Sequence, residues 1–158
     1  MITSSALAML LLAAASQPAA GAATLTLWPG YTIELPRGYC VVLERRADFD
    51  LVYFHDRHAP KGPVLVGIYA GHNPEDLECP KAAKRQWNAN NLNFKSARNA
   101  AGCAEFLVQD LNTAERGFLH LWFGPAAKDH QDLARAVIAS VHASSLPVYR
   151  PDDLPTCE

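Results

Sequence analysis

Residues 50–71, which read DLVYFHD, then RHAPKGP, then VLVGIYAG, decide how the rest of the chain is arranged. Two apolar runs flank a loop that contains Pro and Gly, and this pattern predicts an antiparallel pair of strands. In each run, apolar side chains occupy both sets of alternating positions, which is typical of a strand covered on both faces. We therefore expect this hairpin in the middle of a sheet, with other elements packed on each face.

Residues 1–22 have the pattern of a signal peptide. An apolar run over residues 6–15 is followed by Pro18 and then by the small residues Ala20, Gly21 and Ala22, which suit a cleavage site. The run is about half the roughly 20 residues that a spanning helix needs. We expect an exported protein, periplasmic or secreted, with no stable membrane span in its mature form.

The remaining chain has the size and charge of one small domain. Residues 23–145 are expected to fold as a single unit. The formal net charge of the whole sequence is -2. A protein that binds nucleic acid is normally clearly basic, so we do not expect a nucleic-acid partner.

Four cysteines lie in the mature part, and an even number in an exported chain predicts two disulfides. Three pairings are open, and we favour Cys79 with Cys103 and Cys40 with Cys157. The second bond would tether residues 146–158, an extended tail in which three prolines prevent regular structure.

Two helices are predicted. The first covers residues 81–90 after Pro80, which suits a first turn, and its thin apolar side consists of Ala83 and Trp87. The second follows Asp129, a candidate cap, and carries Asp132 in its first turn. Its apolar stripe consists of Leu133, Val137, Ile138 and Val141.

Further strands are predicted on either side of the first helix. Residues 25–35 alternate around a Trp-Pro-Gly-Tyr turn, residues 39–43 form a single strand, and residues 104–109 with 117–123 form a second hairpin. The expected fold class is α+β: an antiparallel β-sheet with a helix on each face, of which the amphipathic C-terminal helix is one.

Two short segments resemble a known family. Ile33-Glu34-Leu35-Pro36-Arg37-Gly38-Tyr39 is similar to the entry strand of the PsbP-like superfamily of small exported α+β proteins, and Ala136-Val137-Ile138-Ala139-Ser140-Val141 is similar to its closing helix. The resemblance covers residues 27–144. It implies a non-enzymatic adaptor or binding module.

The histidines are the obvious candidates for chemistry. His55 and His58 share a loop but lack the third ligand that a catalytic zinc site uses, and His72 falls at the far end of its strand. His120 lies between aromatic residues, where a hydrogen-bonded, partly buried histidine is expected. No motif of a hydrolase, metalloprotease or nucleotide-binding loop occurs, so we predict no enzyme, no metal and no cofactor.

The sequence therefore favours an exported protein that acts by binding another protein, with an acidic partner surface as the candidate, as an inhibitor, immunity protein or adaptor. A periplasmic module for a small ligand or a metal is the alternative, and a hydrolase-type enzyme ranks third. The candidate contact residues lie in the central loop and on the basic side of the first helix: His55, Asp56, Arg57, His58, Lys61, Lys81, Lys84 and Arg85.

Overall fold

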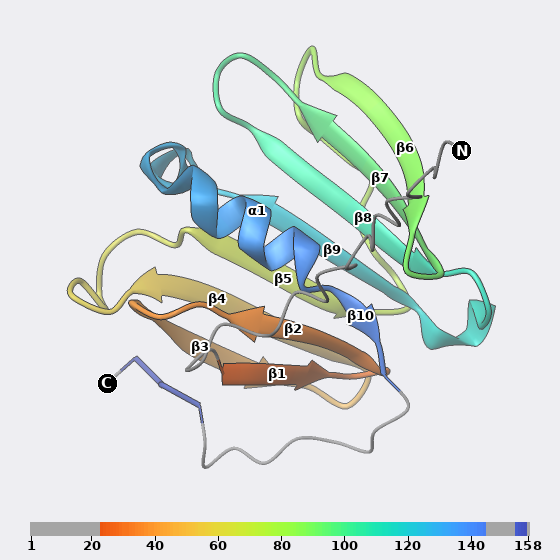
Figure 1. Cartoon of the computed structure of the whole chain (residues 1–158), viewed down its shortest axis with the longest axis horizontal. Coiled ribbons are helices and arrows are strands. Elements are labelled where there is room, and N and C mark those ends of the chain that lie inside the picture. The colour runs from red at the N-terminus through yellow and green to blue at the C-terminus, as the bar shows by residue number, and fades with distance from the viewer. Residues whose placement is uncertain (1–22, 145–153, 158) are drawn as a thin grey trace, which may run out of the picture.

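The computed structural model describes residues 23–144 and 154–157 (Figure 1). The predicted signal peptide and most of the predicted tail lie outside these residues. The described chain is mostly β-structure and forms two antiparallel sheets and one α-helix.

The larger sheet has seven strands in the order β3-β4-β5-β9-β8-β7-β6. The smaller sheet has three strands in the order β1-β2-β10. Helix α1 (Gln131–Ala139) follows a 3-10 helix, η2 (Pro125–His130), and a second 3-10 helix, η1 (Ala114–Arg116), precedes β9. In chain order the strands are β1 (Ala23–Leu27), β2 (Tyr31–Leu35), β3 (Tyr39–Arg45), β4 (Phe49–Asp56), β5 (Val66–Gly71), β6 (Ala83–Ala89), β7 (Leu92–Arg98), β8 (Ala104–Asp110), β9 (Phe118–Phe123) and β10 (His142–Ala143).

The core lies between one face of the larger sheet, here called the inner face, and the layer formed by the smaller sheet and α1 (Figure 1). Alternate residues of the larger sheet point into this space, including Phe54, Ile68 and Leu121, all 0% exposed. Ile33 of β2 and Val137 of α1 are equally buried from the other side. The alternate apolar residues of the strands and the apolar side of the helix therefore pack together in one core.

The expected α+β fold with a helix on each face is wrong, because the first predicted helix is strand β6. The chain turns from β6 into β7 through Asn90 and Asn91, both with left-handed φ angles of 50° and 61°. The helix was inferred from Ala83 and Trp87, four residues apart. Such a pair shares one side in a helix and also in a strand, so it does not distinguish the two.

Among the residues that the structure describes, no helix covers the outer face of the larger sheet. Tyr53 and Trp122 lie half-buried on it, and the connection from β5 to β6, residues 72–82, passes across it, with Glu78 N donating to Glu105 Oε2 over 2.7 Å. A Cβ at Gly67 would collide with the indole ring of Trp122, so the glycine lets that ring lie close to the sheet. The apolar outer positions of the central hairpin are thus only partly covered, by aromatic rings and a single stretch of chain.

Other predicted elements are confirmed. Three pairs of strands form antiparallel hairpins: β1 with β2, β4 with β5, and β8 with β9. The β4-β5 hairpin is expected in the middle of the sheet, but the middle strand is β9. Leu133 and Val137 of α1 are buried as expected. The helix begins one residue later than predicted, since its N-cap is His130 and not Asp129.

Both predicted disulfides are present, Cys40–Cys157 and Cys79–Cys103. Beside the first of them, Val41 N donates to Pro155 O at 3.0 Å and Cys157 N donates to Val41 O at 3.1 Å. The described end of the tail therefore lies beside β3 and pairs with that edge of the larger sheet at Val41.

Candidate functional site

The strand β6 extends beyond the layer that covers the inner face. All seven of its residues are exposed, whereas in β7 only two of seven are. Pairing across β6, β7 and β8 places Arg85 opposite Ser96, and Ser96 opposite Phe106. We call the inner side of these strands the basic-aromatic face and define it by Arg85, Trp87, Phe94, Ser96, Arg98 and Phe106.

The aromatic floor of this face is built from three strands. Trp87 is 37% exposed and stacks on Phe94, with ring centroids 5.1 Å apart and planes 7° apart. Phe106 meets Trp87 edge to face at 6.3 Å. The guanidinium of Arg98 lies 4.8 Å from the Phe106 ring centroid, within the range of a cation-π contact.

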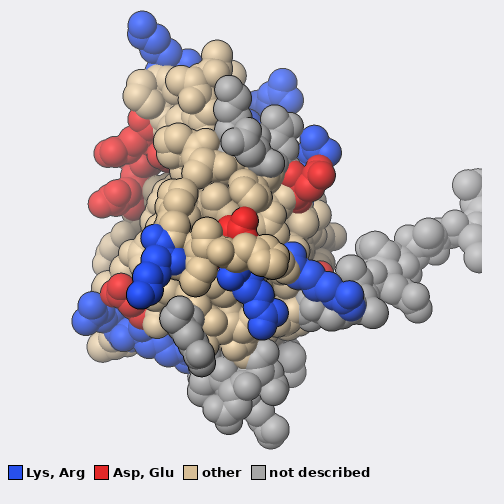
Figure 2. All heavy atoms as spheres, turned by 90° about the vertical axis from the view of Figure 1, so that its left-hand side faces the viewer, with Lys and Arg blue, Asp and Glu red and all other residues tan. Residues whose placement is uncertain are grey.

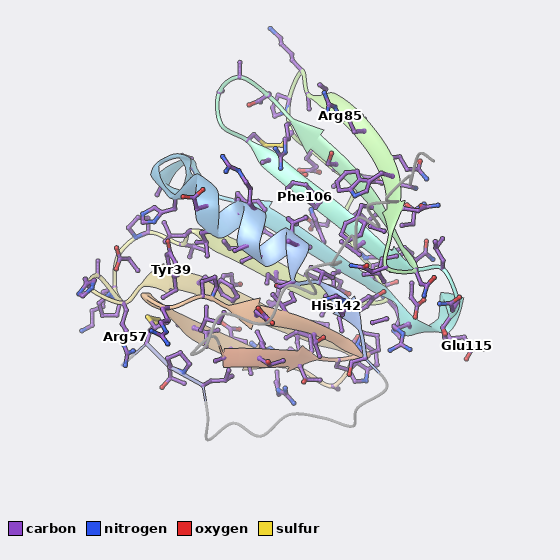
Figure 3. The ribbon with its side chains drawn as sticks, in the orientation of Figure 1. Tyr39, Arg57, Arg85, Phe106, Glu115 and His142 are labelled. Carbon is purple, nitrogen blue, oxygen red and sulfur yellow. A yellow bond between two sulfur atoms is a disulfide. The ribbon has the colours of Figure 1, made fainter. Side chains whose placement is uncertain are left out.

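A hollow of about 450 Å³ opens over this floor. A second hollow of about 290 Å³ shares Arg98 with it and reaches Arg135 on α1. In the described part of the chain Arg135 pairs with Asp132 at 3.2 Å, but neither Arg85 nor Arg98 forms an ion pair. Figure 3 shows Arg85 on β6 and Phe106 on β8 on the side of the sheet that carries α1. The face thus combines two unpaired guanidinium groups with an exposed indole.

The basic residues predicted on one side of the first helix do not share a face, because this segment is strand β6. Lys84 and Arg85 are neighbours in β6, so they point to opposite faces of the sheet. Lys81 lies before the strand in a turn, with a positive φ of 52°. Of the three residues, only Arg85 joins the basic-aromatic face.

The central loop, between β4 and β5, is held by its own hydrogen bonds. His55 Nδ1 lies 3.1 Å from Gly62 O, and His58 N donates to Asp56 Oδ1 at 2.8 Å. Arg57, His58 and Lys61 are exposed. Figure 3 shows Arg57 of this loop far from Arg85. Figure 2 shows the left-hand side of Figure 1, over which Lys and Arg side chains are scattered with Asp and Glu between them. The two predicted sites are therefore separate.

A third hollow, about 590 Å³, lies between the β1-β2 turn, the β3-β4 turn and η1. Two of its charged residues, Asp50 and Arg116, bind other parts of the protein. Asp50 Oδ2 accepts from Trp28 N at 2.9 Å, and Arg116 donates to Asp110 at 2.6 Å and to Gly30 O at 2.7 Å. These contacts join the two sheets, so we interpret this hollow as a structural junction.

Tyr31 lies under the same junction. Its hydroxyl donates to Gly117 O at 2.9 Å and accepts from Asp110 N at 3.1 Å. Burial raises the pKa of Tyr31 to about 12, since the phenolate would lose its hydration there. The phenol therefore remains neutral and holds the strand ends together.

One group of metal-ligating side chains occurs among the described residues: Cys79, Cys103 and Glu105. Both sulfurs are joined in a disulfide and are unavailable as ligands. His120 lies nearby, 8% exposed, with its Nε2 3.8 Å from Glu105 Oε2 and without a hydrogen-bond partner. The expected hydrogen bond of the buried His120 is therefore not formed at this nitrogen.

His55, His58 and His72 do not form a cluster either. His72 Nε2 lies 2.8 Å from Glu115 O, and its ring packs edge-on against Trp28. This contact is at the opposite end of β5 from the central loop, as the sequence predicted.

The sequence does not predict the basic-aromatic face, because its pattern places Trp87 in a helix and places neither Phe94 nor Phe106 in a site. The signal is visible in retrospect: AKRQWNA and LNFKSAR flank an Asn-Asn pair and alternate basic with aromatic residues on one side. Asn tolerates the left-handed conformation that a two-residue hairpin needs.

Comparison with known proteins does not add to this description. No family model, curated protein or solved structure matches the chain. The PsbP-like resemblance therefore stays a prediction. Among the described residues, no helix is both long and apolar enough to cross a membrane.

Proposed function

We propose that this chain is an exported, non-catalytic binding protein whose basic-aromatic face holds an acidic segment of another protein. An inhibitor, immunity protein or adaptor in the periplasm or outside the cell would act in this way. The two disulfides are consistent with export, because such bonds persist in oxidising compartments.

The observation that carries the proposal is the pair of guanidinium groups beside an exposed indole. Arg85 and Arg98 have no carboxylate partner among the described residues, and Trp87 is the next residue after Arg85 on the same face of β6. Arginine and tryptophan are the residue types that most often dominate the energy of protein interfaces. Arginine also binds carboxylates with two parallel hydrogen bonds, so an acidic segment is the complementary partner.

The central-loop residues Arg57 and Lys61 supply a matched comparison. They are exposed cations too, but they lie on a loop with no aromatic floor and with Asp56 beside them. If charge alone decided binding, the central loop and the basic-aromatic face would bind the partner equally well. We assign binding to the face that contains Trp87.

The test is a set of pull-downs from the native extract with purified, disulfide-bonded protein. The wild type should retain a stoichiometric partner whose binding weakens with salt, and Arg85→Glu/Arg98→Glu should weaken it roughly tenfold or more. The control, Arg57→Glu/Lys61→Glu, should retain the partner as the wild type does. A partner that survives the first double variant and is lost from the second would refute the assignment.

A further inference from the structure

The two edge strands of the larger sheet, β3 and β6, differ in what pairs with their open sides. The edge at β3 is paired at Val41 with the described end of the tail, and the Cys40–Cys157 disulfide holds that contact. The edge at β6 is seven residues long, and no described residue pairs with its outer side. β6 also contains no proline, and its register with β7 runs without a bulge. Proteins usually block such an edge, since it offers a template to any extended chain.

The backbone groups that β6 offers follow from its hairpin. The loop of two residues makes Ala89 and Leu92 a hydrogen-bonded pair, so every second residue of β6 turns its N–H and C=O toward β7. The residues between them, Lys84, Gln86 and Asn88, turn these groups to the open edge. Three donors and three acceptors are therefore in place for an additional strand.

We infer that the acidic segment binds as an eighth strand of the larger sheet, antiparallel to β6. This inference rests on the proposed function and specifies how the partner is held. The occupant is an extended acidic peptide segment, because cations lie on both faces of the strand that it would join: Arg85 on the inner face and Lys84 on the outer. Binding by strand addition takes its affinity from main-chain hydrogen bonds and its specificity from alternate side chains.

The register of β6 then defines a sequence preference. Residues opposite one another in an antiparallel pair share a face, so a partner residue opposite Trp87 would lie on the aromatic floor. The next residues of the partner would lie opposite Gln86, Arg85 and Lys84 in turn. The preferred order from N to C is therefore an apolar or aromatic residue, a polar residue, and two acidic residues.

The probe is a fluorescein-labelled peptide of the core sequence Thr-Val-Tyr-Thr-Glu-Glu-Val-Thr, measured by fluorescence anisotropy against the full, disulfide-bonded protein. Its Tyr is designed to lie opposite Trp87 and its second Glu opposite Lys84. The peptide with the reversed sequence has the same charge and composition but the wrong order. We expect it to bind roughly tenfold more weakly if the strand is antiparallel.

Backbone methylation separates strand addition from ordinary charge attraction. An N-methyl group on the central Thr, opposite Gln86, removes a donor that would point at β6, and should weaken binding roughly tenfold. The same group on the first Glu, opposite Arg85, points away from β6 and should leave the affinity within about twofold. Arg85→Glu should abolish binding, whereas Arg57→Glu should not change it.

Each other outcome counts against the inference in its own way. If both methylated peptides bind as well as the parent but Arg85→Glu still abolishes binding, strand addition is wrong and the basic-aromatic face remains the binding site. If the parent peptide does not bind at millimolar concentration, strand addition by this sequence is wrong, and the pull-downs decide the proposed function separately. If sedimentation shows a dimer that Gln86→Pro disrupts, the open edge is occupied by a second copy of this chain instead.

Discussion

Replacing Arg116 by methionine should destabilise the protein more than any other single change of a surface cation. The side chain is 19% exposed, and its Nε donates to Asp110 Oδ2 at 2.6 Å. Its Nη1 donates to Gly30 O in the β1-β2 turn and to Ser144 O just after β10. One guanidinium therefore joins the end of the larger sheet to two places on the smaller one.

The expected cost follows from what remains after the substitution. The Asp110 side chain is 2% exposed, and among the described residues the Asn112 N–H alone would still donate to the carboxylate, at 2.8 Å. Removing one partner of a buried ion pair costs about 3–5 kcal/mol, because the other charge is left without compensation. A domain of this size is stable by about 5–15 kcal/mol, so the loss would be a large fraction of the total.

The assay is urea unfolding followed by tryptophan fluorescence, with the disulfides intact. Arg116→Met should lower the midpoint without changing the slope. Arg116→Met/Asp110→Leu should recover part of the loss, since the unpaired carboxylate is gone. Arg135→Met is the control, because its pair with Asp132 is exposed and should contribute little. A loss below about 1 kcal/mol for Arg116→Met, or strict additivity in the double variant, would show that the junction is not a coupled ion pair.

Three further predictions concern other parts of the fold. Because the pKa of Tyr31 is raised from 10.0 to about 12, its neutral form contributes stability that is complete below pH 10 and lost between pH 10 and 12. The loss is on the order of 3 kcal/mol, and a pH series of unfolding free energies should not show it in Tyr31→Phe. Cys40→Ser/Cys157→Ser removes the disulfide between residues 117 apart and should lower the free energy of unfolding by up to about 5 kcal/mol in the chain-entropy model. An unchanged thermal midpoint would contradict this. Trp87→Ala should cost about 1–2 kcal/mol through loss of its stack on the neighbouring strand, and near-ultraviolet circular dichroism should show the loss of that aromatic pair.

Three local hairpins and the helix were predictable from the sequence, whereas the β6-β7 hairpin was missed although its Asn90-Asn91 turn lies in the sequence. Turn residues and alternation identified the β1-β2, β4-β5 and β8-β9 hairpins. The stripe through Leu133 and Val137 identified α1. By contrast, Ala83 and Trp87 fit a helix and a strand equally, and only pairing with β7 decides between them.

The candidate site depends on that same pairing. Arg98 and Phe106 are eight residues apart in the sequence, and they meet because β7 and β8 run antiparallel. Trp87 reaches Phe106 only across β7, through the stack on Phe94. The sequence identified Arg85 as a contact residue, but the neighbours that distinguish it from Arg57 come from strand register, which a single sequence does not specify.

The arrangement of the two disulfides has a consequence for how the protein matures. The Cys79–Cys103 bond lies, in sequence, wholly inside the loop closed by Cys40–Cys157. In the exported chain that we propose, Cys40 would emerge first and meet Cys79 long before its native partner, so oxidation in order of arrival would join the wrong pair. Correct pairing then requires that Cys40 stay reduced until synthesis is complete, or that a thiol exchange the premature bond afterwards. We expect a cell that makes this protein to depend on disulfide isomerisation, and not on oxidation alone, for its yield.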